Sequence, residues 1–219
     1  MTPVTEMQNA SLGPHPLLVL GVLATILAGC ASSPSSQFYR LHALPERTPP
    51  TSDPSTCQAI TVTIGPVHIP DYLERPQIMT RVGDNELKLS EFHRWAGSLE
   101  TEVTRVLTED ISGLLPADQL SVTRWVPYLE SQRPASCRVE VFVDRFEGTL
   151  GDSVVLKAQW VVFGHRSGVL LRRELLTREP VDGNRYDALA AAMSRALERL
   201  SRDIGDGVMS VCEKVQTGG

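Results

Sequence analysis

The side chains that could carry out hydrolytic chemistry are scattered along this chain and form no motif. A hydrolase needs a nucleophile, a base and a group that orients the base. Gly164-His165-Arg166-Ser167-Gly168 comes nearest, but its order is not Gly-Xaa-Ser-Xaa-Gly and it falls in a predicted hairpin turn. Glu109 and Asp110 are adjacent on a predicted helix, so their carboxylates face different ways. The sequence therefore predicts that the protein is not an enzyme.

The cysteines and histidines show no metal-ligand spacing. Cys57, Cys137 and Cys212 form no Cys-Xaa-Xaa-Cys pair, and no histidine lies close enough to them in sequence to suggest a zinc site. We therefore predict no metal and no cofactor. Cys57 precedes a predicted strand and Cys212 lies near the end of a predicted helix, so a Cys57–Cys212 disulfide could tie the chain ends together. A Cys57–Cys137 bridge is the alternative, and at least one thiol stays free.

Cys30 stands in a different setting, directly after an apolar run. The run from Leu17 to Leu27 contains no charge. At about a dozen residues it is too short to cross roughly 30 Å of hydrocarbon, but it has the length of a signal-peptide core. Leu27-Ala28-Gly29-Cys30 resembles the lipobox of bacterial lipoproteins, in which the cysteine is acylated and the signal is cut before it. The resemblance implies a signal peptide over residues 1–29, an acylated Cys30, and a short tether that ends at residue 36.

The charge of the chain excludes one class of partner and shows one departure from a usual signal peptide. The 219 residues carry a formal net charge of −5 with no block of Lys or Arg, so we expect no nucleic-acid partner. No Lys or Arg precedes Cys30, and Glu6 is the only charged side chain before it. A start at Met7 would remove Glu6 and leave the free amine as the positive end.

The spacing of apolar residues predicts strands, a helix, more strands and a second helix. Residues three and four apart form apolar stripes from Leu99 to Leu114 and from Tyr186 to Ile204. Alternating patterns and turn residues predict the strands Phe38–Leu41, Ile60–Ile64, Gln77–Val82, Glu86–Leu89, Leu120–Trp125, Arg138–Gly148, Ser153–Phe163 and Val169–Thr177. The last three would form an antiparallel meander. The predicted fold class is α+β: a single domain over residues 37–215, with a mixed, mostly antiparallel sheet and two amphipathic helices packed on it.

One segment covers residues 65–81 and reads Gly-Pro-Val-His-Ile-Pro-Asp-Tyr-Leu-Glu-Arg-Pro-Gln-Ile-Met-Thr-Arg. It resembles the signature of the PqiC (YmbA) family. These are envelope lipoproteins, also described as auxiliary lipoprotein components of ABC-type transport. Further matching segments are Arg94-Trp95-Ala96, Arg105-Val106-Leu107, Arg145-Phe146-Glu147, Ala158-Gln159-Trp160, Tyr186-Asp187-Ala188-Leu189 and Ala192-Met193-Ser194. The likeness therefore extends from the lipobox almost to the C-terminus.

The resemblance implies assembly and not catalysis. It implies a lipoprotein on the periplasmic face of the outer membrane, present as a ring of copies and supporting membrane integrity. The ring would dock on a periplasm-spanning MCE-domain (PqiB-like) protein that conducts lipids together with an inner-membrane partner. Ala31 is compatible with export to the outer membrane, since Asp at that position is the usual retention signal. The alternative is a lipoprotein that binds a hydrophobic ligand in its own pocket, which would require a large apolar cavity.

One segment of the signature has the composition of a partner contact. Tyr72 and Leu73 lie between Asp71 and Glu74, and aromatic residues with apolar neighbours are favoured at protein interfaces. We therefore select Tyr72, Leu73 and Arg75 as candidate interface residues. The prolines around them could simply bend the strands.

Overall fold

The computed structural model describes residues 34–45, 60–117, 120–130, 136–165 and 167–217. Residues from Ser36 onward form one compact unit. The signal peptide predicted for residues 1–29, the lipidated Cys30 and Cys57 lie outside the described residues, as does the side chain of Cys212. The acylation and the Cys57–Cys212 disulfide therefore stay predictions.

The described chain contains strands and helices in mixed order. The strands are β1 (Gln37–Tyr39), β2 (Ile60–His68), β3 (Gln77–Arg81), β4 (Leu87–Trp95), β5 (Leu120–Arg124), β6 (Cys137–Gly148), β7 (Ser153–Gly164) and β8 (Gly168–Pro180). The helices are a 3-10 turn η1 (Asp71–Leu73), α2 (Leu99–Leu114), the short α3 (Pro127–Glu130) and α4 (Tyr186–Thr217).

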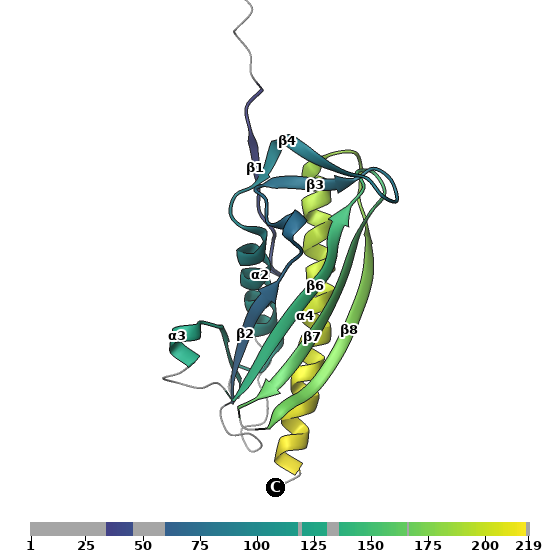
Figure 1. Ribbon diagram of the computed structural model, residues 1–219. Coiled ribbons are helices and arrows are strands. Elements are labelled where there is room, and N and C mark those ends of the chain that lie inside the picture. The colour runs from purple at the N-terminus through teal and green to yellow at the C-terminus, as the bar shows by residue number, and fades with distance from the viewer. Residues whose placement is uncertain (1–33, 46–59, 118–119, 131–135, 166, 218–219) are drawn as a thin grey trace, which may run out of the picture. The chain divides into compact units, whose positions relative to one another are not determined.

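All eight strands join one mixed sheet (Figure 1). Along the sheet the order is β1-β4-β3-β6-β2-β5, and β6 also pairs with β7, which pairs with β8. β6, β7 and β8 form the predicted antiparallel meander, and their two pairings are the longest in the sheet. β1 with β4, β2 with β5, and β2 with β6 are parallel pairs. The predicted fold class, an α+β domain with a mixed sheet and two packed helices, is confirmed.

Strand β2 continues through the Gly65-Pro66 step that the sequence presents as an interruption. Gly65 has a φ of 114°, a conformation that side-chain-bearing residues rarely adopt. The register against β6 shifts between Ile64 and Val67, so the strand bulges there and then resumes its pairing. This irregularity lets Val67 return to the core after the kink.

Helices α2 and α4 bury the faces that their apolar stripes predict. Ser98 caps α2, since its side chain accepts a hydrogen bond from the Thr101 backbone N–H. α4 packs against β6, β7 and β8, and it also contacts α2 (Figure 1). Gly207 on α4 is required by this contact, because a Cβ at that position would collide with the indole ring of Trp160.

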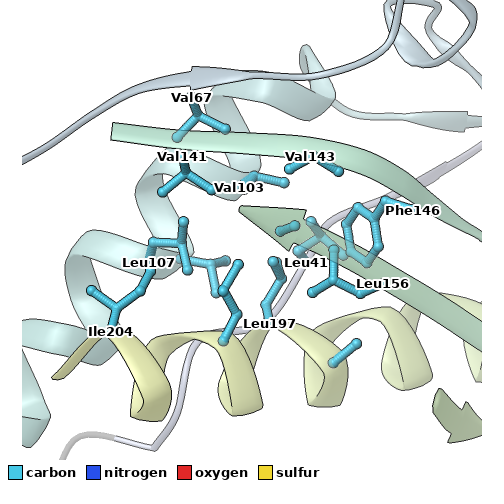
Figure 2. Close-up of a cluster of buried hydrophobic side chains, with 14 of the residues drawn as sticks. Leu41, Val67, Val103, Leu107, Val141, Val143, Phe146, Leu156, Leu197 and Ile204 are labelled. Atoms are coloured by element: carbon cyan, nitrogen blue, oxygen red, sulfur yellow. The ribbon is translucent and has the colours of Figure 1, made fainter. Parts of the chain in front are cut away.

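The hydrophobic core fills the space between the sheet and the two helices. Trp160 and Phe146 are its largest fully buried side chains. Figure 2 shows Val141, Phe146 and Leu156 from the sheet meeting side chains of the two helices, such as Leu107 and Leu197. Burying each such side chain contributes about 1.5–3 kcal/mol. The core therefore holds sheet and helices together along their length.

Several elements differ from the predictions. β1 covers Gln37–Tyr39 and not Phe38–Leu41, because the Leu41 backbone binds Arg105 on α2 instead of a neighbouring strand. β2 and β8 extend to His68 and Pro180, and η1 was not predicted. β4 extends to Trp95 because its second half pairs with β1 and β3, which a hairpin pattern alone does not reveal. α3 was not predicted, and α4 continues beyond Ile204 to Thr217. In the described part of the chain, no helix, α4 included, has the length and apolar composition needed to span a bilayer.

Candidate functional site

The segment that leads from β1 into the domain is held in place by both long helices. We call residues Arg40–Leu44 the strap. Leu41 is buried in the core, and its carbonyl accepts a hydrogen bond of 2.6 Å from Arg105 Nη2 on α2. The backbone N–H of Leu44 donates to Asp110 Oδ1 at 2.7 Å, and that of His42 donates to Ser194 Oγ on α4 at 3.0 Å. Side chains of two helices thus bind the backbone of a segment without regular structure.

Two buried acids of α2, Glu102 and Asp110, bind the strap, and their pKa values are shifted in opposite directions. Burial raises the pKa of Glu102, but hydrogen bonds from Arg105 and Arg40 outweigh this and bring the pKa below its usual range. Asp110 is also buried, and the N–H of Leu44 and the hydroxyl of Ser201 do not offset the desolvation, so its pKa is raised. The charge of Glu102 is balanced by two guanidinium groups, whereas no described residue places a cation beside Asp110.

The candidate interface segment is more deeply built into the fold than its sequence suggests. Leu73 is buried in the core, because the η1 turn directs it inward against the sheet. The prediction that Leu73 forms part of an exposed anchor is therefore wrong. Arg75 is exposed, and Tyr72 is half-buried with its ring packed against the core. Only these two of the three selected residues present surface to solvent.

Tyr72 belongs to a polar cluster around a carboxylate that has no solvent exposure. Its hydroxyl donates to Glu147 Oε2 at 2.7 Å. The other oxygen of Glu147 accepts from Arg81 Nη2 at 2.8 Å and from Arg145 Nε at 2.6 Å. Burial raises the pKa of Glu147, but the hydrogen bonds from Tyr72, Arg81 and Arg145 outweigh it and lower the pKa below its ordinary value. The cluster ties η1 and β3 to β6.

In this arrangement neither Glu147 nor Tyr72 can readily exchange a proton with a substrate. The Glu147 carboxylate is stabilised in its charged form by its donors, and it is shielded from solvent. Desolvation and the hydrogen bond to Glu147 raise the pKa of Tyr72 far above its ordinary value, so the phenol stays protonated. A strongly perturbed pair can mark a catalytic site, but here every partner is a structural contact between elements.

The histidines and the Gly164–Gly168 segment do not assemble a catalytic group in the described residues. The segment is the turn between β7 and β8, and both His165 and Ser167 are exposed on it. His68 pairs with Glu140 at 2.9 Å and stacks on Phe142. His93 lies 2.7 Å from the hydroxyl of Tyr39 and stacks on Tyr186. The described part of the chain also contains no group of three or more His, Cys, Asp or Glu side chains that could hold a metal ion.

Cys137, the first residue of β6, is a buried free thiol. Burial raises its pKa, so it is kept in the unreactive thiol form. The alternative Cys57–Cys137 bridge is therefore not formed in this structure. The prediction that at least one thiol stays free is confirmed at this position.

The described surface carries several shallow hollows with mixed linings. One of about 460 Å³ lies beside α2 and is lined by residues that include Leu44, Asp110 and Val122. A second of about 560 Å³ lies at the start of β1 and α4, and its lining includes Tyr39, His93 and Arg185. Both combine charged and aromatic or aliphatic residues. Neither is the large apolar cavity expected of a carrier for a hydrophobic ligand.

Almost the whole folded unit matches one protein family. Residues 39–205 match the family described as ABC-type transport auxiliary lipoprotein component. The chain belongs to this family. The resemblance seen in the sequence is thereby confirmed at the level of the family. Membership makes the chain a lipoprotein of the cell envelope and an auxiliary component of ABC-type transport. No curated protein matches this auxiliary lipoprotein.

Solved structures share the fold of this auxiliary lipoprotein at low sequence identity. Protein XCC0632 from Xanthomonas campestris, a DUF330 protein, is 14% identical, with a TM-score of 0.65 over 83% of this chain and 99% of its own. An uncharacterized protein is 18% identical, with a TM-score of 0.63 over 80% of this chain and 99% of its own. The PelC dodecamer from Paraburkholderia phytofirmans is 11% identical, with a TM-score of 0.38 over 69% of this chain and 94% of its own. That last likeness is too slight to bear on the assembly of this chain.

Proposed function

We propose that this chain is the outer-membrane-anchored auxiliary subunit of an MCE-type intermembrane lipid transport system. It acts as a docking and assembly module and carries out no chemistry of its own. The family match over residues 39–205 carries this proposal. The lipid on Cys30 would hold the domain at the periplasmic face of the outer membrane, and Ala31 agrees with that destination.

The way the domain uses its reactive side chains supports a role without catalysis. Glu147, Glu102 and Asp110 are buried acids with shifted pKa values, and each one joins separate segments of the fold. Each of these acids accepts hydrogen bonds from other residues of the domain. A nucleophile, a base and an orienting group within reach of one another would be needed for a hydrolase.

The packing of the domain favours assembly over carriage of a ligand. Trp160, Phe146 and the aliphatic residues between sheet and helices fill the interior. A carrier would instead enclose most of its ligand in an apolar pocket of several hundred Å³. The hollows beside α2 and β1 are open and partly charged, so a carrier for a hydrophobic ligand is the second candidate.

Within this proposal, Tyr72 and Arg75 form the partner contact, with Leu73 supporting them from the core. Arg75 is exposed and makes no ion pair with any residue that the structure describes, so it is available to an acidic partner. A ring of copies would present this contact several times to one MCE-domain protein. Repetition strengthens binding, because each further contact within one assembly is effectively intramolecular.

Co-purification in mild detergent tests the proposal. A tagged chain extracted from membranes should bring down an MCE-domain protein, and Arg75→Glu should weaken that recovery. Arg124→Glu is the matched control, since Arg124 is likewise exposed and unpaired among the described residues but lies on β5. Repeated recovery of a monomer without an MCE-domain protein would contradict the conduit role. Recovery of a monomer with a bound lipid would favour the carrier.

A further inference from the structure

The end of the domain that carries β1 exposes an aromatic side chain beside an unpaired cation. Phe38, in the middle of β1, is 65% exposed. Across the parallel pair it lies opposite Arg94 on β4, which forms no ion pair with any described residue. Among the described strands β1 pairs with β4 alone, so Phe38 lies at the edge of the sheet. Side chains alternate along a strand, so Tyr39 and His93 lie on the other face of this pair, where they contact Tyr186. We call Phe38, Arg94, Tyr39, His93 and Tyr186 together the β1-end surface.

Ring contacts hold the aromatic part of this surface together. The rings of His93 and Tyr186 stack with centroids 3.9 Å apart, and Tyr39 packs against both at 5.6 and 6.4 Å. The Tyr39 hydroxyl lies 2.7 Å from His93 Nδ1, which fixes the ring orientations. Tyr186 begins α4, so the cluster joins β1, β4 and the helix. The strand that carries Phe38 is therefore held by contacts to β4 and α4.

The length of chain before β1 limits how far this surface can lie from a lipid anchor. Only seven residue steps separate Cys30 from Gln37. Fully extended, they span at most about 25 Å. β1, β4 and the first turn of α4 lie at one end of the folded unit, and the turn between β7 and β8 lies at the other (Figure 1). A protein acylated at Cys30 must therefore keep its β1 end within that distance of the bilayer.

We infer that the β1-end surface docks on the membrane that holds the anchor, with Phe38 entering the boundary between headgroups and acyl chains. Aromatic side chains favour this boundary. Arg94 is placed to pair with a lipid phosphate beside Phe38. The inference rests on the proposed lipidation of Cys30 and goes beyond it, because it fixes the orientation of the domain. This contact would be a second attachment to the membrane, in addition to the acyl chains on Cys30. It would direct the β7–β8 end away from the bilayer.

Tryptophan substitution in the acylated protein tests this orientation. Phe38→Trp and Val169→Trp would each be purified from membranes and placed in vesicles of phosphatidylethanolamine and phosphatidylglycerol, with and without brominated acyl chains. Val169 is the matched control, because it is 54% exposed but lies at the start of β8. Emission from the native Trp95, Trp125 and Trp160 is subtracted with the unsubstituted protein. Phe38→Trp should show a blue shift and lose its added emission to bromine, whereas Val169→Trp should keep its emission.

Two failures are distinguishable. Equal quenching of the two variants, or none at position 38, in a protein that carries its acyl mass and floats with the vesicles would overturn the membrane contact alone. A mature protein without acyl mass that fails to float would overturn the proposed anchor, and the inference with it. The exposed site and the aromatic replacement at position 38 should leave the fold intact, which circular dichroism of the same samples verifies.

Discussion

At the scale of single residues, two buried carboxylates show how the environment decides the sign of an electrostatic contribution. Glu147 has no solvent exposure, yet two guanidinium groups and a phenol donate to it. Asp110 is almost as deeply buried, but its donors are a backbone N–H and a hydroxyl. The first charge is stabilised by its surroundings, whereas the second is tolerated at a cost.

Replacing Glu147 with Gln should strongly destabilise the domain. The variant leaves Arg81 and Arg145 beside a neutral group, and breaking a buried ion pair in this way costs about 3 kcal/mol. Because the folded-state pKa of Glu147 is lowered, its contribution is complete above the ordinary Glu value of about 4.3 and disappears as the pH falls through the folded-state pKa. Urea unfolding at a series of pH values should show the difference from wild type shrinking in acid. Glu198→Gln, which removes a surface pair with Arg202, should cost at most about 0.5 kcal/mol.

Asp110→Asn should behave in the opposite way. Its pKa is raised in the fold, so the ionised carboxylate lowers stability at neutral pH, and protonation relieves that loss as the pH falls. Asn keeps an oxygen for the Leu44 N–H and can donate to the Ser201 hydroxyl. The variant should therefore be at least as stable as wild type near neutral pH, and the two should converge below about pH 4. A clear loss of stability at neutral pH would show that the charge itself is required.

At the scale of elements, local patterns revealed what each segment forms but not what it pairs with. The apolar stripes of α2 and α4 and the alternation in β6, β7 and β8 were sufficient to predict those elements. The parallel pairing of β2 with β6, and the second half of β4, depend on partners far away in sequence. A bulge such as the one after Gly65 also changes which residues face the core.

The strap could not be foreseen because it has no periodic signal, and the prediction that its first two residues, Arg40 and Leu41, end a strand is wrong. Arg40–Leu44 forms no regular structure, and its backbone partners come from α2 and α4, more than sixty positions later in the chain. The same holds for the cluster around Glu147: Arg145-Phe146-Glu147 reads as an ordinary strand segment in the sequence. Its role becomes visible only in the folded structure, where Glu147 is buried and accepts hydrogen bonds from Arg81 on β3 and Arg145 on β6. The candidate residue Tyr72 was selected for an interface, and the structure adds this internal contact.

Leu41→Ala tests whether the strap stabilises the fold. Leu41 is buried between the sheet and the helices, so the cavity left by the truncation should cost about 3 kcal/mol. Leu176→Ala is the control, because Leu176 on β8 is 67% exposed and its truncation should change stability by less than about 0.5 kcal/mol. Denaturant unfolding measures both variants. Equal stability of Leu41→Ala and Leu176→Ala would show that the strap is dispensable.

At the scale of the whole molecule, the strap joins the proposed anchor to the core. The strap directly follows β1, so any pull on a lipid at Cys30 reaches the domain through β1 and then through a backbone bound by both long helices. Such a connection passes load to α2 and α4, which pack on the core. The position of the strap therefore agrees with a domain that works while tethered to a membrane.

Cys30→Ala separates the anchor from the fold. The acyl chains on Cys30 supply the membrane affinity, at about 0.8 kcal/mol for each buried methylene. A contact through Phe38 alone is far smaller, so the variant should move from the membrane pellet to the soluble periplasmic fraction. Its unfolding transition should be unchanged, since the described fold begins after the tether. Cys137→Ala, which removes a buried thiol, should remain in the membrane fraction and carry the acyl mass. If Cys30→Ala still pelleted with membranes while Cys137→Ala behaved like wild type, attachment would have to come from protein contacts rather than from lipid.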